Sequence, residues 1–161
     1  MFKIETIHHV SLPVSSIEKA KDFYGGVLKL KEIKRPDSMV SGSKAFPGAW
    51  YEVGDRALHL IVDDESTFRK YQDGKAKPLS SRDIHFAIRV QSFGETLRYL
   101  LEQGYDKGAE EGEKAMKVSP KSSAGFPQIY ITDPDNNVIE LNAAHLDLDE
   151  TELKELGLGK K

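Results

Sequence analysis

The sequence His-Val-Ser-Leu-Pro-Val-Ser-Ser-Ile at residues 9–17 recurs, position for position, as His-Phe-Ala-Ile-Arg-Val-Gln-Ser-Phe at residues 85–93. Each copy begins with alternating apolar and polar residues, a pattern typical of a half-buried strand. The apolar residues of each strand share one face, and His9 and His85 lie on the opposite face. A repeat of this kind predicts that a supersecondary unit has been duplicated.

A predicted helix follows each copy of this strand. A Ser-x-x-Glu capping signal begins each helix, at Ser15–Glu18 in the first copy and at Ser92–Glu95 in the second. Apolar residues continue at helical spacing, and Gly104 is placed to end the second helix. Strands joined by turns then complete each copy. These further strands are predicted at residues 50–53, 57–62, 128–132 and 138–142.

The last strands of the two copies also correspond to each other. Superimposing Leu-His-Leu at 58–60 on Ile-Glu-Leu at 139–141 makes His59 and Glu140 equivalent. Each is a polar residue between apolar neighbours, so we expect each to point away from the apolar face of its strand.

Polar segments separate and follow the two copies. Residues 108–125, rich in Lys, Ser, Glu and Gly, are a candidate lid before the penultimate strand. The repeat predicts one domain in residues 1–145, followed by a C-terminal helical tail at 146–161. Its two modules are predicted at about 5–63 and 82–144, with a linker at 64–81.

The composition restricts the partners and the possible ligands. With 23 Lys and Arg against 26 Asp and Glu, the net charge is −3 and the positive residues are scattered, which argues against a nucleic-acid partner. No cysteine is present, so His and carboxylate side chains are the ligands available to a metal. No segment approaches the roughly 20 apolar residues that span a membrane, and charges occupy the N-terminal stretch. We therefore expect a cytoplasmic protein without a membrane partner.

Four polar residues opposite the apolar faces form the candidate site: His9, His59, His85 and Glu140. A buried polar group without a partner costs about 1–3 kcal/mol, so four such groups need a shared partner. If each module curls into a half-cup, pairing the halves brings the four together. Imidazole and carboxylate suit a divalent ion such as zinc, nickel, iron or manganese. His8 should point away from His9 and have a structural role.

With these motifs in place, the chain resembles the vicinal oxygen chelate superfamily, which includes glyoxalase I, bleomycin-resistance proteins, fosfomycin thiol transferases and extradiol dioxygenases. The resemblance covers nearly the whole chain and implies an α+β fold of two βαβββ modules that form a cupped mixed sheet around a metal, often in a homodimer. It rests on His-His-Val-Ser-Leu-Pro-Val at 8–14, Asp-Phe-Tyr at 22–24, Leu-His-Leu at 58–60, Ile-His-Phe-Ala at 84–87 and Asp-Pro-Asp-Asn-Asn-Val-Ile-Glu-Leu at 133–141.

The resemblance implies a glyoxalase-like, metal-dependent lyase or isomerase. Such an enzyme would act on a small oxygenated metabolite or thiol adduct through a metal-stabilised enediolate, with Glu140 as both metal ligand and catalytic base. The chain departs from glyoxalase I at His59, where that enzyme usually has an acidic residue. Two alternatives stay open: a non-catalytic ligand-binding protein of bleomycin-resistance type, whose members usually lack metal ligands, and a fosfomycin-type thiol transferase. Extradiol dioxygenases are usually much longer, which argues against that activity.

Four aromatic residues are candidates for contact with the small-molecule substrate. Related enzymes often have an aromatic residue at the position of Tyr130, and the other three could line an apolar pocket. Packing between sheet and helix is the alternative role for all four. They are Tyr130, Trp50, Phe46 and Phe126.

Overall fold

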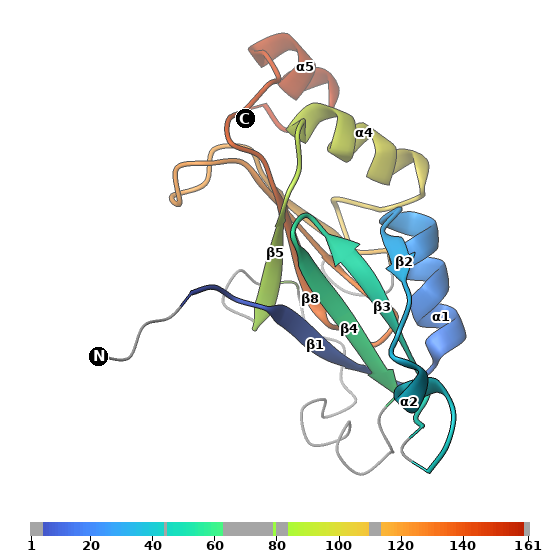
Figure 1. Cartoon of the computed structure of the whole chain (residues 1–161). Helices are drawn as coiled ribbons and strands as arrows, with labels where there is room; N and C mark the ends of the chain where they lie inside the picture. Colours follow the sequence, from blue (N-terminus) through green and yellow to red (C-terminus); the bar gives the residue numbers. More distant parts are fainter. Residues whose placement is uncertain (1–4, 44, 63–78, 80–83, 110–113, 160–161) are drawn as a thin grey trace. The chain divides into compact units, whose positions relative to one another are not determined.

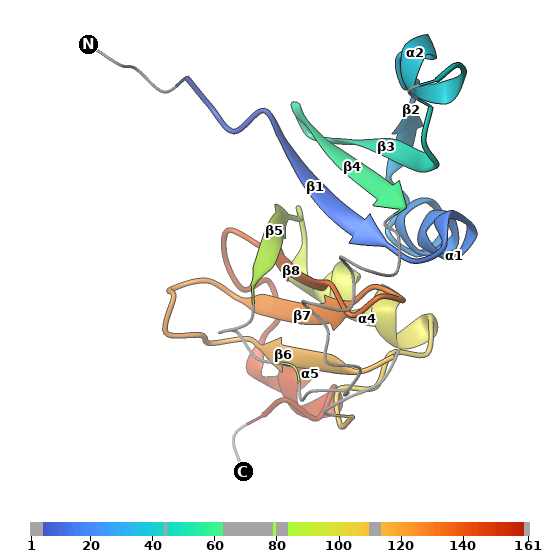
Figure 2. The same cartoon turned by 90° about the horizontal axis from the view of Figure 1, so that it is seen from below.

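Residues 5–43, 45–62, 79, 84–109 and 114–159 are described by the structure, a computed structural model. The chain divides into two compact units (Figures 1 and 2). Unit 1 comprises Met1–Lys75 and Asp133–Asp135, and unit 2 comprises Ala76–Thr132 and Asn136–Lys161. The predicted linker at 64–81 lies outside the described residues except for Leu79. Of the helices in the described part of the chain, none is long and apolar enough to cross a membrane.

Unit 1 contains a four-stranded mixed sheet with the strand order β1-β4-β3-β2 (Figure 1). The edge strand β1 runs parallel to β4, and β3 is antiparallel to both β4 and β2. The bounds are His9–Val14 for β1, Lys31–Ile33 for β2, Gly48–Val53 for β3 and Arg56–Val62 for β4. The predicted strands at 50–53 and 57–62 are confirmed. The sequence did not predict β2, because its three residues include exposed Lys31 and Glu32 and no apolar alternation.

Helix α1 (Ile17–Lys21) covers the apolar face of this sheet and continues directly as the π-helix η1 (Asp22–Val27). Its cap is Ser16, whose hydroxyl accepts a hydrogen bond from the N–H of Lys19. The predicted cap at Ser15 is therefore wrong by one residue. The hydroxyl of Ser15 instead donates a 2.5 Å hydrogen bond to Asp135. A four-residue helix, α2 (Asp37–Val40), follows β2.

The acidic segment Asp133–Asp135 is part of unit 1, although the residues on both sides of it belong to unit 2. Asp135 accepts hydrogen bonds from the backbone N–H and the hydroxyl of Ser15, at 3.0 and 2.5 Å. Asp133 accepts a 2.9 Å hydrogen bond from the hydroxyl of Tyr24 in η1. The backbone N–H of Asp135 also donates to Asp133 at 2.9 Å. The turn thus uses its two carboxylates to bind the start of α1 and the buried side of η1.

Unit 2 repeats the topology of unit 1, with the strand order β5-β8-β7-β6 (Figure 2). The parallel pair is β5 and β8, and β7 is antiparallel to β8 and β6. The α+β fold of two βαβββ modules is thereby confirmed. The strand bounds are His85–Arg89 for β5, Met116–Ser119 for β6, Gln128–Thr132 for β7 and Val138–Asn142 for β8.

Strand β6 lies within the segment predicted to be a lid. Met116 is fully buried and pairs with Ile131 of β7, so this part of residues 108–125 belongs to the sheet. The prediction of a lid is wrong for these four residues. The abundance of Lys and Ser around them concealed a short edge strand that has only one fully buried apolar side chain.

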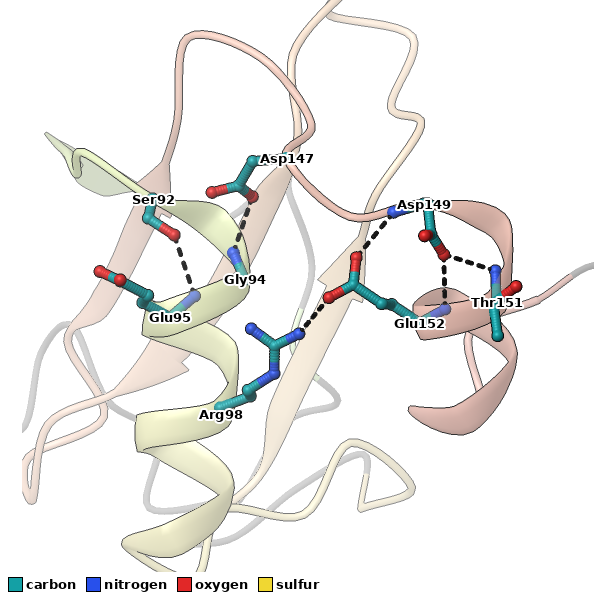
Figure 3. Close-up of polar contacts among 8 residues, drawn as sticks. All are labelled: Ser92, Gly94, Glu95, Arg98, Asp147, Asp149, Thr151 and Glu152. Carbon is teal, nitrogen blue, oxygen red and sulfur yellow. Dashed lines mark hydrogen bonds and ion pairs between the residues drawn. The ribbon is translucent and has the colours of Figure 1, made fainter.

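Helix α4 (Phe93–Glu102) begins as the sequence predicted, at the cap Ser92 (Figure 3). The hydroxyl of Ser92 accepts a 3.0 Å hydrogen bond from the N–H of Glu95. A second side chain caps this helix end, because the carboxylate of Asp147 accepts a 2.9 Å hydrogen bond from the N–H of Gly94. Gly104 has a φ of +84°, which confirms the predicted glycine after the helix.

The tail contains a short helix, α5 (Glu150–Glu155), as predicted. Asp149 caps it, and Asp149 and Glu152 form a reciprocal capping box (Figure 3). Arg98 of α4 donates a 2.7 Å hydrogen bond to Glu152. A surface hollow of about 300 Å³ lies beside α5 and is lined by none of the predicted site residues.

Candidate functional site

Unit 2 brings His85 and Glu140 together. His85 is the first residue of β5, and Glu140 is the central residue of β8, which pairs with β5. The Nε2 atom of His85 lies 3.2 Å from Oε2 of Glu140. Glu140 is only 4% exposed, so its carboxylate must find its partners within the protein.

Three neutral side chains surround the Glu140 carboxylate. Its Oε1 accepts hydrogen bonds from the amide groups of Gln128 and Asn142, at 3.1 and 2.6 Å. Its Oε2 accepts a 2.8 Å hydrogen bond from the hydroxyl of Tyr130. Tyr130 pairs with Glu140 across β7 and β8, and Gln128 pairs with Asn142, so all four side chains share one face of the sheet.

These contacts determine the charge of Glu140. Burial alone would raise its pKa, but the hydrogen bonds from Asn142, Tyr130 and Gln128 and the nearby His85 lower the pKa below its usual value. The same carboxylate and, above all, burial raise the pKa of Tyr130, which keeps its hydroxyl protonated. Glu140 is therefore an ionised, buried carboxylate, and no Lys or Arg of the described residues is paired with it.

The His85 and Glu140 pair has the donor atoms and the spacing of two metal ligands. Ligand atoms about 2.1 Å from a divalent ion lie about 3.0–3.4 Å apart when the angle at the metal is octahedral or tetrahedral. The observed separation of 3.2 Å between Nε2 and Oε2 falls within this interval. A cation would also balance the buried negative charge that the neutral donors leave in place.

Unit 1 brings His9 and His59 together in a different way. Their rings stack, with centroids 4.2 Å apart and planes 16° from parallel. Trp50 of β3 stacks on His59 with a centroid separation of 3.9 Å and an angle of 4°. His59 lies between the buried residues Leu58 and Leu60, so its side chain points to the face opposite the core, as predicted. Burial first, and then the nearby His9 and His8, lower the pKa of His59, which favours the neutral imidazole that binds metals.

His8 does not point away from His9 as the sequence suggested. Its Nδ1 atom lies 2.9 Å from Nδ1 of His9, and the two rings meet edge to face. The expectation assumed strand alternation, but β1 begins at His9 and leaves His8 outside the strand.

The four predicted ligands are thus present as two pairs, one in each unit. Within the described residues, no group of three or more His, Asp or Glu side chains is close enough to hold a metal ion. The pairs are His9 with His59 and His85 with Glu140.

The predicted aromatic residues have two different environments. Tyr130 and Trp50 lie against predicted ligands, since the Tyr130 ring meets His85 edge to face at 5.5 Å and Trp50 stacks on His59. Phe46 and Phe126 instead pack under arginine side chains. The guanidinium carbons of Arg35 and Arg89 lie 4.6 and 5.0 Å from the centres of these two rings, respectively.

Sequence reasoning missed Gln128 and Asn142. A usable signal was present, because each is a polar residue two positions from a predicted site residue on the same strand. Two-residue spacing in a strand places side chains on the same face. The amide pair beside Tyr130 and Glu140 was therefore predictable from the register of the last two strands.

Comparison with known proteins agrees with the fold. Residues 6–141 match the sequence profile of the Glyoxalase/Bleomycin resistance protein/Dioxygenase superfamily. The chain is similar to Glyoxylase I 4 of Arabidopsis thaliana, with 25% identity over 138 residues that make up 86% of this chain and 70% of that protein.

Two solved structures have the same fold. A protein from Bacillus anthracis assigned to the glyoxalase family is 21% identical, with a TM-score of 0.65 and coverage of 89% of this chain and 98% of that one. A mutant of the fosfomycin resistance protein FosX from Listeria monocytogenes, in complex with Mn(II) and 1S,2S-dihydroxypropylphosphonic acid, is 18% identical, with a TM-score of 0.61 and coverage of 90% and 96%. The profile match over most of its length shows that the chain belongs to the Glyoxalase/Bleomycin resistance protein/Dioxygenase superfamily.

Proposed function

We propose that the protein is a glyoxalase-type, metal-dependent lyase or isomerase that acts on a small oxygenated metabolite or its thiol adduct. The proposed ligands of the divalent ion are His9, His59, His85 and Glu140, and the ion is zinc, nickel, iron or manganese. The observation that carries the proposal is the 3.2 Å approach of His85 Nε2 to the buried, ionised carboxylate of Glu140.

Two further observations support this proposal. His59 is held between Trp50 and His9 with its pKa lowered by burial, so unit 1 also presents a neutral imidazole on the sheet face opposite its core. The relatives include a protein named as a glyoxylase and a FosX structure that contains Mn(II).

The residues of the chain have distinct roles in this proposal. A bound cation would polarise a substrate carbonyl or hydroxyl and stabilise the negative charge that develops beside it. Once released from the cation, Glu140 would take the proton from the adjacent substrate carbon through Oε2, which faces His85. Tyr130 donates its hydroxyl proton to that same oxygen and would hold it in place during the transfer.

A fosfomycin-type reaction is a second candidate, and the charges on the sheet favour it. Arg89 is paired with Asn142 in the sheet and Lys117 with Tyr130, so both exposed cations lie on the face that contains Glu140. Such cations suit an anionic substrate such as a phosphonate. The phosphonic acid in the FosX structure is a ligand of that relative.

The test begins with protein purified without chelator or nickel resin, followed by metal analysis. Turnover is then measured with a panel of thiohemiacetals and, separately, with fosfomycin plus thiol or water. Glu140→Gln should abolish turnover of the thiohemiacetal, and unchanged turnover with metal still bound would contradict its role as the base. Metal-free protein that still binds an aromatic ligand would instead indicate a non-catalytic binding protein.

The homodimer that the resemblance implies and the cytoplasmic location that the composition suggests stay predictions. Light scattering of the purified protein tests the first, and fractionation of the source cells tests the second.

A further inference from the structure

We propose that Gln128 and Asn142 act as an amide clamp, which holds Oε1 of Glu140 and directs Oε2 toward a divalent cation. The clamp would set the metal affinity of the site without contacting the metal. This inference rests on the proposed function, because it takes Glu140 to be a metal ligand.

Counting hydrogen-bonding sites on the carboxylate shows which oxygen remains available. An ionised carboxylate only accepts hydrogen bonds, and each of its oxygens has about two lone-pair sites. The amides of Gln128 and Asn142 both donate to Oε1 and fill its sites. Tyr130 donates to Oε2 and fills one more, and the His85 Nε2 atom lies 3.2 Å from that oxygen. The remaining site on Oε2 therefore faces the second predicted ligand, so Glu140 would bind through one oxygen.

The buried amide oxygen of Asn142 is consistent with the clamp. Its amide nitrogen must face Glu140, because a carboxylate cannot donate a hydrogen bond to the amide oxygen. Its Oδ1 atom is consequently left buried without a hydrogen-bond partner among the described residues, although Asn142 is only 6% exposed. An unsatisfied buried oxygen is unfavourable. The unsatisfied Oδ1 belongs to the same amide group whose Nδ2 atom donates to the Glu140 carboxylate.

The clamp is built on rigid elements and leaves the charge of Glu140 intact. Gln128 and Asn142 are direct partners across β7 and β8, and every residue of these two strands is buried. Groups held by strands keep their geometry better than groups held by loops. Because amides are neutral, they orient the carboxylate and leave its negative charge available to attract a cation. A Lys or Arg in the same place would cancel that charge.

Titration with Co²⁺ of metal-free, full-length protein tests the clamp, with the visible absorption bands of the ion as the readout. The variants are Gln128→Met and Asn142→Leu, which remove the donors and retain bulk, with Asn142→Ala as the smaller replacement. Gln91→Met, at an exposed amide in unit 2, is the matched control, and His85→Ala removes a proposed ligand. Thermal unfolding of each metal-free variant establishes that it is folded.

The expected result is that the clamp variants bind Co²⁺ about 10- to 100-fold more weakly than the wild type, as is usual when a group supporting a ligand is removed. Their absorption bands should also change, because a released carboxylate can coordinate differently. Gln91→Met should match the wild type.

Two contrary outcomes are distinguishable. In the first outcome, the wild type binds Co²⁺ and His85→Ala does not, but the folded clamp variants keep the wild-type affinity and spectrum. The clamp is then wrong, and the proposed metal site stands. If the wild type does not bind Co²⁺, or His85→Ala binds it equally well, the proposed metal site is wrong and the clamp with it.

Discussion

The hydroxyl of Tyr24 donates a 2.9 Å hydrogen bond to Oδ2 of Asp133, a residue 109 positions further along the chain. Both side chains are buried, and Asp133 is only 2% exposed. Burial and the charge of Asp133 raise the pKa of Tyr24, so the phenol remains protonated and keeps donating. This bond ties an acidic turn to η1 within unit 1.

Replacing Tyr24 with Phe should lower the free energy of unfolding by about 1–3 kcal/mol, because the buried Asp133 carboxylate loses a donor and gains no other. Urea denaturation of the two proteins measures the difference. Asp133→Asn, which retains an acceptor oxygen, should restore part of the lost stability in the Phe background. A Tyr24→Phe protein within about 0.5 kcal/mol of the wild type, the usual range for neutral surface changes, would contradict this interpretation.

Replacing Gly48 with Ala should be destabilising by about 1–3 kcal/mol, the usual cost of overpacking. A Cβ atom at Gly48 would lie 2.5 Å from the backbone oxygen of Leu60 in the neighbouring strand β4, which is held by its ladder hydrogen bonds. At Gly26 a Cβ would have no atom within 4 Å, so Gly26→Ala is the control and should be neutral or stabilising. Thermal melts of both variants give the comparison, and equal melting temperatures would rule out the clash.

The contribution of Asp147 to the free energy of unfolding should depend on pH. Burial alone would raise its pKa, but hydrogen bonds from Ser92 and the N–H of Gly94 lower the pKa below its usual value. Figure 3 shows the bond from Gly94. A carboxyl whose pKa is lowered by folding stabilises the protein fully above its unfolded pKa of about 3.9 and loses that effect as the pH falls through the folded pKa. Asp147→Asn should therefore be less stable than the wild type at neutral pH, and the difference should shrink below about pH 4. A stability difference between Asp147→Asn and the wild type that stays constant from pH 7 to below pH 4 would contradict this role of Asp147.

The fluorescence of Trp50 should report metal binding by His59. Trp50 is the single tryptophan of the chain and stacks on His59 at 3.9 Å. A paramagnetic ion such as Co²⁺ bound to that imidazole should quench the emission, and His59→Ala should remove the saturable part of the quenching. His145→Ala, at an exposed histidine in unit 2, is the control. Identical titration curves for the wild type and His59→Ala would show that His59 is not a ligand.

The sequence was sufficient to predict the parts of the fold that depend on short-range periodicity. Alternation in residues 128–132 and 138–142 located β7 and β8 to the residue, and the repeat placed His59 and Glu140 at equivalent positions of β4 and β8. The Ser92 cap was also found, because its hydrogen bond to Glu95 is local.

The features that were missed depend on partners distant in the sequence. Ser15 and Ser16 are equivalent as local caps, and only the contact of Ser15 with Asp135 decides which of them caps α1. Strands β2 and β6 are short edge strands whose pairing, rather than their own residues, makes them strands. In the candidate site, the alternation placed Glu140 but could not show that Gln128 and Asn142 donate to the same oxygen.

Because Asp133–Asp135 belongs to unit 1, the chain cannot be cut between its two copies without separating this segment from the rest of that unit. A fragment that stops at Lys75 lacks the carboxylates that meet Ser15 and Tyr24. The C-terminal fragment keeps the two carboxylates but lacks Ser15 and Tyr24, which donate hydrogen bonds to them. Although the two copies are similar in topology, a cut at their junction separates Asp133 and Asp135 from Tyr24 and Ser15, so a split-protein reporter built there would start with both halves incomplete.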